Sequence, residues 1–237
     1  MFATFCRSAR LTAVAVAAAL LLPAAAVAKP AKSAKAKGRP EAAAPAAPAA
    51  PSIAIAPKPS SGRPAGDPKQ WIDGLAKRLD TLSQNAKNNG ALHSQIGQAL
   101  DDLVDYAEMG RLALPKHWDG LTDAQKAEYL SLLRKMLHNT YVKRFKSGTT
   151  VKIDYKQVRP LQDGKVEVQT ELTVKRTAAD VHYAMHPGDG RWWVYDITVD
   201  DASQVGNYRK SFTKIMNKEG FTGLVARMTK AANKKPG

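Results

Sequence analysis

The stretch Arg191–Leu224 reads RWWVYDITVDDASQVGNYRKSFTKIMNKEGFTGL and joins an alternating segment to an amphipathic one. In its first half, large apolar residues recur with a period of two: Trp193, Tyr195, Ile197 and Val199. Successive side chains of a strand point to opposite faces of its sheet. The pattern therefore predicts a strand over 191–199 whose apolar face carries these four residues.

The second half of the stretch predicts a helix that packs back onto this strand. Ser203 offers the side-chain oxygen that a helix N-cap uses. Apolar residues follow at spacings of three and four, which is typical of a helix with one buried face: Val205, Tyr208, Phe212 and Ile215. Gly220 is expected to end this helix because glycine adopts positive φ at little cost. A second short apolar helix should then begin at Phe221.

The order of elements indicates the fold class. Four strands are expected, over 150–158, 165–175, 181–186 and 191–199. The turn signals Asp163-Gly164 and Pro187-Gly188-Asp189-Gly190 predict that at least two neighbouring pairs are antiparallel hairpins. We therefore expect one α+β domain with one core, in which N-terminal and C-terminal helices cover an antiparallel four-stranded curved sheet.

Three helices are predicted ahead of the strands from apolar residues at helical spacing. The first carries Trp71, Leu75, Leu79 and Leu82. The second carries Leu92, Ile96, Leu100, Leu103 and Tyr106. The third begins at a capping box formed by Thr122 and Gln125. Its inward side is expected to carry Leu130, Leu133, Met136, Leu137 and Tyr141.

Elements in both halves of this domain resemble the toluene-tolerance family. The downstream elements are Val194-Tyr195-Asp196, Ser203, Asn207-Tyr208-Arg209, Phe212, Gly220-Phe221 and Gly223-Leu224. The upstream elements are Asp105-Tyr106, Met109, Arg111, Ala113-Leu114, Trp118 and Leu121-Thr122. The resemblance covers residues 90–230 and implies a phospholipid carrier of the Mla lipid-transport type, with a lipid cavity between sheet and helices.

The apolar side of the sheet is then the expected wall of that cavity. On the second strand, Val166, Val168, Leu172 and Val174 share one face, and charged or polar residues occupy the other. Periodicity alone favours a solid core because protein interiors are closely packed, whereas the resemblance favours a hollow one. The expected lipid-binding residues are Leu133, Met136, Leu137, Tyr141, Val166, Val168, Leu172, Val174, Tyr183, Met185, Trp193, Tyr195, Ile197, Tyr208 and Phe212.

Arg209 is the candidate charged residue of this site. It lies about 100° around the helix from Tyr208, near the edge of the apolar stripe. It is expected either to hold a lipid phosphate or to pair with an internal carboxylate such as Asp196. The internal pair is favoured, because a carrier that is indifferent to headgroup gains little from a rigid phosphate clamp.

The N-terminal 66 residues predict export. Arg7 and Arg10 precede an apolar run over 11–22, and Ala26-Val27-Ala28 fits a cleavage site, so residues 1–28 are expected to be a signal peptide. A retained membrane anchor is the alternative, but the run is shorter than the ~20 residues of a transmembrane helix. Residues 29–66 are rich in Ala, Pro and Lys and predict a disordered tail. Residues 67–237 are then the phospholipid-binding domain, and the expected location is periplasmic.

Charge and cysteine content exclude several classes of function. Cys6 is the only cysteine and lies in the predicted signal peptide, so neither a disulfide nor a thiolate site is expected in the mature chain. The net charge is +15, of which residues 67–237 carry +7. This excess suits anionic headgroups, acidic partner surfaces or solubility alone. No nucleic-acid partner is expected, because no recognisable nucleic-acid motif accompanies the charge.

The polar residues do not predict an enzyme, a cofactor or a metal site. The five histidines, which lie outside zinc-protease, nucleophile-elbow and phosphate-loop motifs, are His93, His117, His138, His182 and His186. His182 and His186 would lie about 13 Å apart on one strand and are expected to face solvent. Asp101, Asp105 and Glu108 are expected to share one solvated helix face.

The resemblance also implies the function and the partners. Phospholipid is the expected cargo, to be carried between an inner-membrane lipid ABC transporter complex and an outer-membrane lipoprotein-porin complex. Moving a sixteen-carbon chain out of water is worth about 13 kcal/mol at ~0.8 kcal/mol per methylene, so transfer is expected only between docked proteins. Two alternatives remain: a periplasmic adaptor or chaperone with a solid core, and an enzyme acting on lipid or cell-wall material.

Overall fold

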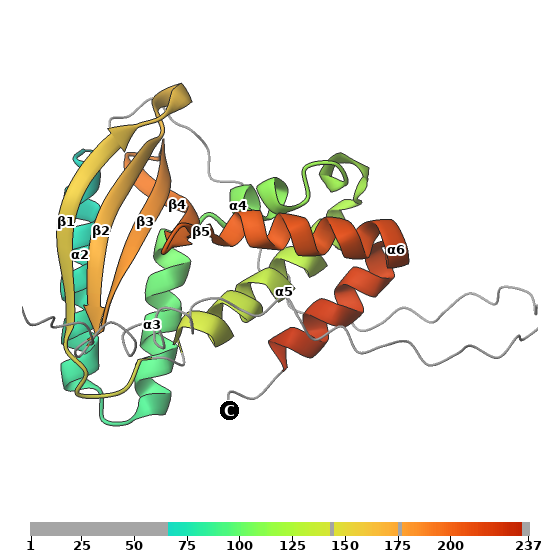
Figure 1. Cartoon of the computed structure of the whole chain (residues 1–237). Helices are drawn as coiled ribbons and strands as arrows, with labels where there is room; N and C mark the ends of the chain where they lie inside the picture. Colours follow the sequence, from blue (N-terminus) through green and yellow to red (C-terminus); the bar gives the residue numbers. More distant parts are fainter. Residues whose placement is uncertain (1–65, 143–144, 175–176, 234–237) are drawn as a thin grey trace, which may run out of the picture.

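A curved antiparallel sheet occupies one side of the molecule and a group of helices the other (Figure 1). The computed structural model describes residues 66–142, 145–174 and 177–233. The predicted signal peptide and all but the last residue of the predicted tail lie outside these ranges. None of the helices in the described ranges has the length and hydrophobicity of a transmembrane segment.

Five strands follow one another in sequence order across the sheet. They are β1 (Val151–Pro160), β2 (Val166–Val174), β3 (Thr177–Gly188), β4 (Arg191–Val199) and β5 (Ala202–Ser203). The helices are α2 (Pro68–Asn85), α3 (Asn89–Leu103), α4 (Tyr106–Ala113), α5 (Asp123–Tyr141) and α6 (Gln204–Ala232), with short 3-10 turns at Trp118–Gly120 and Gln162–Gly164. The predicted α+β class with an antiparallel sheet is confirmed.

The sheet has five strands, so the predicted number of four is wrong. After β4 the chain reverses at Asp200 and Asp201, whose φ angles are 45° and 65°, and Ala202–Ser203 pairs back onto β4. A two-residue turn with positive φ at both positions suits the twist of a hairpin. Aspartate adopts such angles less readily than glycine, so Asp200-Asp201 is a weaker turn signal than a pair that contains glycine. The predicted turn before β4 does form, at Asp189 and Gly190 with φ of 52° and 73°.

A β-bulge at Tyr195 changes the side-chain alternation of β4. Val194 pairs with Met185 and Asp196 pairs with Ala184, so Tyr195 is an extra residue between two regular pairs. Because of this extra residue, the period-two alternation after the bulge is out of phase by one position with the alternation before it.

The bulge therefore separates residues that the sequence placed on one face. Trp192 and Val194 share the inner face of the sheet with Ile197 and Val199. The prediction that Trp193 and Tyr195 share the face of Ile197 is wrong, and both lie on the opposite side.

Helices α2 and α3 cover the inner face of the sheet. The buried residues there, which we call the sheet cluster, are Ile72, Leu103, Val168, Val181, Tyr183, Met185, Trp192, Val194, Ile197 and Val199. Partly buried side chains pack against them, including Trp71 and Leu75 of α2. In Figure 1, α2 runs along the strands. The apolar stripe predicted for the first helix thus closes the dry face of the sheet.

Helices α4, α5 and α6 pack on one another beside the sheet. Their buried residues, which we call the helical cluster, include Met109, Leu114, Tyr129, Leu133, Met136, Leu137, Tyr208, Phe212, Leu224 and Met228. A third, smaller cluster joins α2 to α3 through Leu79, Leu92, Ile96 and Val142. The buried residues therefore form three clusters, and Leu75 packs against both the sheet cluster and the third one.

Three local features predicted from the sequence are present in the structure: two helix N-caps and one helix break. The capping box of Thr122 and Gln125 begins α5. Ser203 Oγ accepts a hydrogen bond from the Gly206 amide at 2.8 Å and begins α6. Gly220 has φ of 65° and bends α6 sharply, so that its two arms fold back on each other (Figure 1).

The second predicted helix is broken at Val104. There the chain is extended and bridges Val194, and the Asp105 amide donates to the Val194 carbonyl at 2.9 Å. The Asp105 carboxylate then caps α4 by accepting from the Glu108 amide at 2.9 Å. Tyr106 therefore belongs to α4, and the expectation that Asp101, Asp105 and Glu108 share one helix face is wrong. Pairing with the edge of β4 replaces the helical hydrogen bonds at this point.

Asp101 is the centre of a polar contact between α3 and α5. Its carboxylate accepts from Arg134 Nε at 2.8 Å and from Tyr106 Oη at 2.9 Å, and it contacts His138 Nε2 at 2.8 Å. Burial opposes its ionisation, but these hydrogen bonds outweigh burial and hold the pKa of Asp101 well below its usual range. Asp101 thus forms a structural ion pair with Arg134, whereas the sequence predicted that its carboxylate faces solvent.

His186 makes a second polar contact, between the sheet and α4. Its side chain is 11% exposed, and Nε2 lies 3.0 Å from Asp105 Oδ2. Burial disfavours the charged ring, but the hydrogen bonds to Asp105 and to the Pro187 carbonyl outweigh burial and raise the pKa of His186. The expectation of a solvent-facing His186 is wrong.

We predict that this contact makes stability fall as pH rises. A histidine whose folded pKa is raised stabilises the fold fully below its unfolded pKa of about 6.5, and this contribution is lost as pH rises through the folded pKa. His186→Gln should therefore flatten the dependence of melting temperature on pH between about 6 and 8.

The matched control is His182→Gln on the same strand. The His182 ring lies 3.9 Å from Glu167, beyond hydrogen-bonding distance. This variant should keep the wild-type profile. A wild-type profile that remained in the His186 variant would show that the contact with Asp105 does not control the pH dependence.

Candidate functional site

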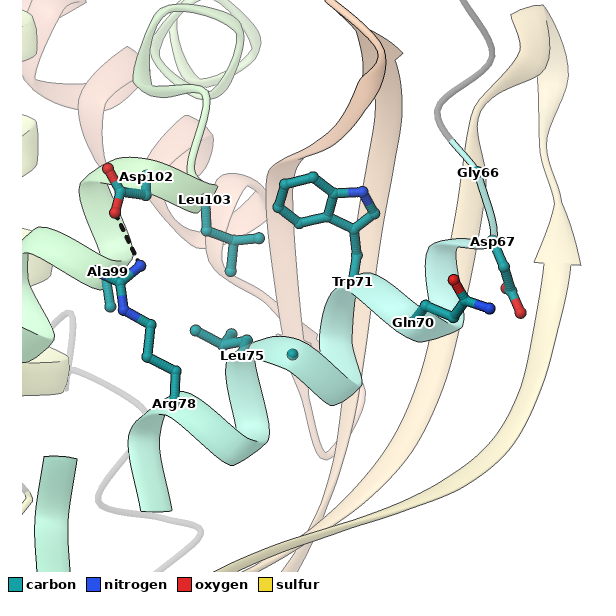
Figure 2. Close-up of a pocket in the computed structure, with 10 residues that line it drawn as sticks. Gly66, Asp67, Gln70, Trp71, Leu75, Arg78, Ala99, Asp102 and Leu103 are labelled. Atoms are coloured by element: carbon teal, nitrogen blue, oxygen red, sulfur yellow. Dashed lines mark hydrogen bonds and ion pairs between the residues drawn. The ribbon is translucent and has the colours of Figure 1, made fainter. Parts of the chain in front are cut away.

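A cavity of about 280 Å³ lies between α2 and α3 (Figure 2). Its apolar wall is formed by Trp71 and Leu75 of α2 and by Ala99 and Leu103 of α3. Its polar rim is formed by Gly66, Asp67, Gln70, Gly74, Arg78 and Asp102. Helical spacing explains the α2 side, because residues 67, 71, 74, 75 and 78 fall on one face of a helix.

The apolar wall of the cavity continues into the core beneath the sheet. Leu103 belongs to the sheet cluster, and Trp71 and Leu75 pack against that cluster. Leu75 also contacts the third cluster, between α2 and α3. In Figure 2 the side chains of Trp71, Leu75 and Leu103 lie close together in the space between the two helices. The cavity is therefore an opening in the layer that covers the dry face of the sheet.

Hydrogen bonds hold α2 near both of its ends. At the N-terminal end, Trp192 Nε1 donates to the Gly66 carbonyl at 3.0 Å and Tyr155 Oη donates to the Lys69 carbonyl at 2.5 Å. At the C-terminal end, Ser83 Oγ donates to the Thr149 carbonyl at 2.7 Å. Between these ties, Ile72 and Leu75 pack on the sheet cluster, so hydrophobic contacts hold the middle of α2.

One ion pair crosses the mouth of the cavity. Arg78 Nη1 lies 2.9 Å from Asp102 Oδ2, as the dashed line in Figure 2 marks. The two side chains are 47% and 59% exposed. An exposed pair of this kind contributes only about 0–1 kcal/mol. It orients the rim without locking the two helices together.

The predicted lipid-binding residues on the strands lie on the same side of the sheet as this cavity, except at the bulge. Val168, Tyr183, Met185 and Ile197 are members of the sheet cluster, and Val166 and Leu172 pack against it. Val174 is half-buried and shares their face by alternation on β2. Trp193 and Tyr195 are on the other face, because of the bulge.

The predicted lipid-binding residues on the helices lie elsewhere. Leu133, Met136, Leu137, Tyr208 and Phe212 all belong to the helical cluster. The Tyr208 and Phe212 rings stack at 5.0 Å between centroids, and Tyr129 meets Phe212 edge-on at 6.0 Å. Tyr141 ends α5, and its side chain is outside the described part of the structure. The sequence pattern thus combined residues of two separate clusters into one expected site.

Arg209 and Asp196 each have other partners, so the favoured internal pair is wrong. Arg209 Nε donates to the Leu112 carbonyl at 2.9 Å. Asp196 accepts from Ser203 Oγ at 2.6 Å and from the Val205 amide at 3.0 Å. Burial raises the pKa of Asp196 although these donors oppose the shift. Asp196 belongs to β4, and its carboxylate lies beside the first turn of α6, where it accepts from the N-cap Ser203 and the Val205 amide.

Sequence reasoning missed the cavity itself. It predicted Trp71, Leu75 and Leu103 as buried helix stripes and assigned no role to Arg78 or Asp102. The adjacent pair Trp71 and Ile72 was an available signal, because two large apolar neighbours widen the buried stripe of a helix. The contact of α2 with α3 at this point depends on the tertiary fold and leaves no spacing pattern in the sequence.

The cavity offers recognition chemistry and no evident catalytic group. Among the described residues that line it there is no histidine, serine or cysteine. No group of three or more histidine, cysteine or acidic residues within the described ranges is placed to hold a metal ion. Its polar groups are amide, guanidinium and carboxylate, which can bind an ionic or hydrogen-bonding ligand end.

Comparison with known proteins agrees with the predicted relationship. Of the solved structures, a phospholipid-binding protein from Ralstonia solanacearum, in complex with a phospholipid, has a TM-score of 0.63 and 19% sequence identity. The match covers 70% of this chain and 97% of that chain, and it shows a shared fold. No curated protein matches the chain.

A family model described as MlaC protein matches residues 69–230, which include most residues that line the cavity, the whole sheet and most of α6. The chain therefore belongs to the MlaC family.

Proposed function

We propose that this protein is a phospholipid-binding shuttle of the periplasm. The observation that carries the proposal is the cavity between α2 and α3, whose apolar wall joins the dry face of the sheet. Membership of the MlaC family supports the same reading, as does the shared fold with a protein solved in complex with a phospholipid. Binding, without chemical conversion, is the proposed role.

The acyl chains would lie against the sheet cluster. A volume of about 280 Å³ is at the lower end of the ~300–1,000 Å³ typical of small-molecule sites. Two long chains need more room, so loading must move the middle of α2 or α3 away from the sheet. Burial of each sixteen-carbon chain supplies about 13 kcal/mol before ordering costs. This gain is large enough to stabilise an open form over the closed one.

The headgroup would stay at the rim of the cavity. Gln70, Arg78 and Asp102 lie there and offer donors and acceptors near water. Burying a charged phosphate without hydrogen-bond partners would cost more free energy than burial of the acyl chains supplies. A lipid orientation with tails toward the sheet and phosphate toward the rim satisfies both requirements.

Transfer would occur only between docked proteins. Release of an acyl chain into water loses the same burial energy that drives loading, so spontaneous exchange should be slow. The two proteins proposed to exchange lipid with this carrier are an inner-membrane lipid ABC transporter complex and an outer-membrane lipoprotein-porin complex. Partner contacts that favour the open cavity would let lipid pass directly, and ATP hydrolysis would take place in the transporter.

We predict that protein purified without added lipid carries about one phospholipid per chain. A ligand buried in an apolar cavity is retained through aqueous purification because its release is slow. Organic extraction followed by mass spectrometry and phosphorus assay checks this. Gently prepared protein that contains neither acyl chains nor phosphorus would contradict the proposed function.

We predict that Leu172→Glu lowers lipid loading. Leu172 packs against the sheet cluster, so the substitution places a carboxylate among the acyl chains, at a desolvation cost of several kcal/mol. The matched control is Glu171→Gln, one residue away on the outer face, which removes only an exposed ion pair with Lys156 at 3.1 Å. Loading per folded chain is measured after circular dichroism has shown that both variants are folded. Equal loading would place the acyl chains elsewhere.

We predict that the helical cluster supports the fold without holding lipid. Leu133 is fully buried there, so Leu133→Ala should lower the free energy of unfolding by about 2–5 kcal/mol. Lipid content per folded molecule should stay at the wild-type level. Urea denaturation and lipid extraction measure the two quantities on the same sample. If the Leu133→Ala variant lost lipid while its stability was unchanged, the lipid would be shown to bind in the helical cluster and this prediction would be wrong.

A further inference from the structure

Arg191, the first residue of β4, lies beside the cavity and close to two tryptophans. Its guanidinium carbon is 4.8 Å from the centre of the Trp71 ring, which lines the cavity, and 3.8 Å from the centre of the Trp193 ring. The next residue, Trp192, donates to the carbonyl of Gly66 on the cavity rim. The start of β4 is therefore fixed against the N-terminal end of the cavity.

The guanidinium of Arg191 has an unused donor. Its Nε is buried and has no hydrogen-bond partner among the described residues. Arg78, the other arginine at this place, is paired with Asp102. Buried polar donors in folded proteins almost always have a partner. The buried Nε donor of Arg191 is therefore expected to have a hydrogen-bond partner that is not part of the described chain.

Nearby carboxylates do not compensate this charge. Burial lowers the pKa of Arg191, and the fields of Asp102 and Asp189 oppose this shift only in part. The Asp102 carboxylate accepts from Arg78 at 2.9 Å, and Asp189 is exposed in the turn before β4. Asp67, also on the rim, caps α2 by accepting from the Lys69 amide. The site thus holds a partly desolvated cation whose acidic neighbours are engaged elsewhere or exposed to solvent.

We propose that Arg191 binds the phosphate group of the lipid in the cavity. This inference rests on the proposed function and adds a ligand group to it. The planar guanidinium stacks on aromatic rings through its face and binds phosphate oxygens through its edge. Trp71 and Trp193 both lie within 5 Å of the guanidinium carbon, so the N–H edge is the part that can bind an anion. The phosphodiester is common to phospholipids, so this contact recognises the class without selecting one headgroup.

A packing role alone does not account for Arg191. Contact with two indole rings requires a flat or apolar side chain, and neither contact needs the Nε donor. Cation–π attraction holds the charge over the rings, but the rings offer the donor no oxygen. A phosphate oxygen at the rim would satisfy the donor and the charge together.

The test is a competition between two lipids that differ in the phosphate group. Delipidated protein is loaded from mixed vesicles that contain phosphatidylglycerol and diacylglycerol of identical acyl chains, and bound lipid is quantified by mass spectrometry. Wild-type protein should prefer the phospholipid. Arg191→Gln should lower this preference at least about tenfold, the effect of losing one charge-assisted hydrogen bond. Diacylglycerol loading should be unchanged.

Two further variants make the result specific. Arg191→Lys keeps the charge but loses the stacked fork, and it should retain an intermediate preference. Arg159→Gln is the matched control, because Arg159 is an exposed arginine of β1 that contacts Glu167 at 3.3 Å. It should load both lipids as the wild type does. If Arg191→Gln does not fold, the preference of the lysine variant decides, and a wild-type value there contradicts the proposal.

The outcomes separate the two levels of the argument. Wild-type protein that loads neither lipid would overturn the proposed function. Loading of both lipids with a preference that Arg191→Gln leaves unchanged would overturn the role of Arg191 while lipid binding stands. Stabilisation of delipidated wild type, but not of Arg191→Gln, by inorganic phosphate without any lipid preference would identify free phosphate as the ligand and overturn the lipid assignment.

Discussion

The apolar inner face of the sheet determines where the first two helices must lie. A single antiparallel meander presents one apolar face, and this face must be covered because exposing it to water is unfavourable. The meander cannot cover itself, so the cover comes from α2 and α3, which precede it in the chain. The cavity lies where this cover is incomplete, between Trp71, Leu75 and Leu103. Fold and candidate site thus have the same physical origin.

The helices α4, α5 and α6 form a second body that does not need the sheet for its core. Their apolar residues pack on one another around Tyr129 and Phe212. Polar contacts join the two bodies: Asp101 with Arg134 and His138, and His186 with Asp105. Hydrogen bonds are more directional than apolar packing. The polar contacts therefore fix the orientation of the bodies, and the apolar clusters stabilise each one.

Features set by neighbouring residues could be predicted from the sequence, and features set by distant contacts could not. Thr122, Ser203 and Gly220 each act within their own turn of helix. The two caps and the helix break that they predict are all present. The family was also predicted and is confirmed, because its signature is distributed along the chain. The break at Val104 arises from pairing with Val194, far along the chain. The bulge at Tyr195 lies within the β3–β4 hairpin, but it interrupts the alternation on which the prediction relied. No local pattern encodes them.

The candidate site shows the same division. Period two correctly placed Val168, Met185 and Ile197 on the dry face, but it also included Trp193 and Tyr195, which the bulge moves away. Helical spacing identified the stripes of α5 and α6 as buried without showing that they bury one another. The actual wall depends on how α2 meets α3. That meeting is a tertiary contact, so residues such as Arg78 and Arg191 gave no signal.

The ties at the two ends of α2 have a calorimetric consequence. Because Gly66, Lys69 and Ser83 hold the ends, a lipid that enters replaces only apolar contacts between α2 and the sheet. The protein surfaces are out of water before loading and remain so afterwards. Their contribution to the heat-capacity change should then nearly cancel. Acyl chains that arrive from a membrane or a docked partner are also out of water before and after loading, so the heat-capacity change measured on loading should be close to zero.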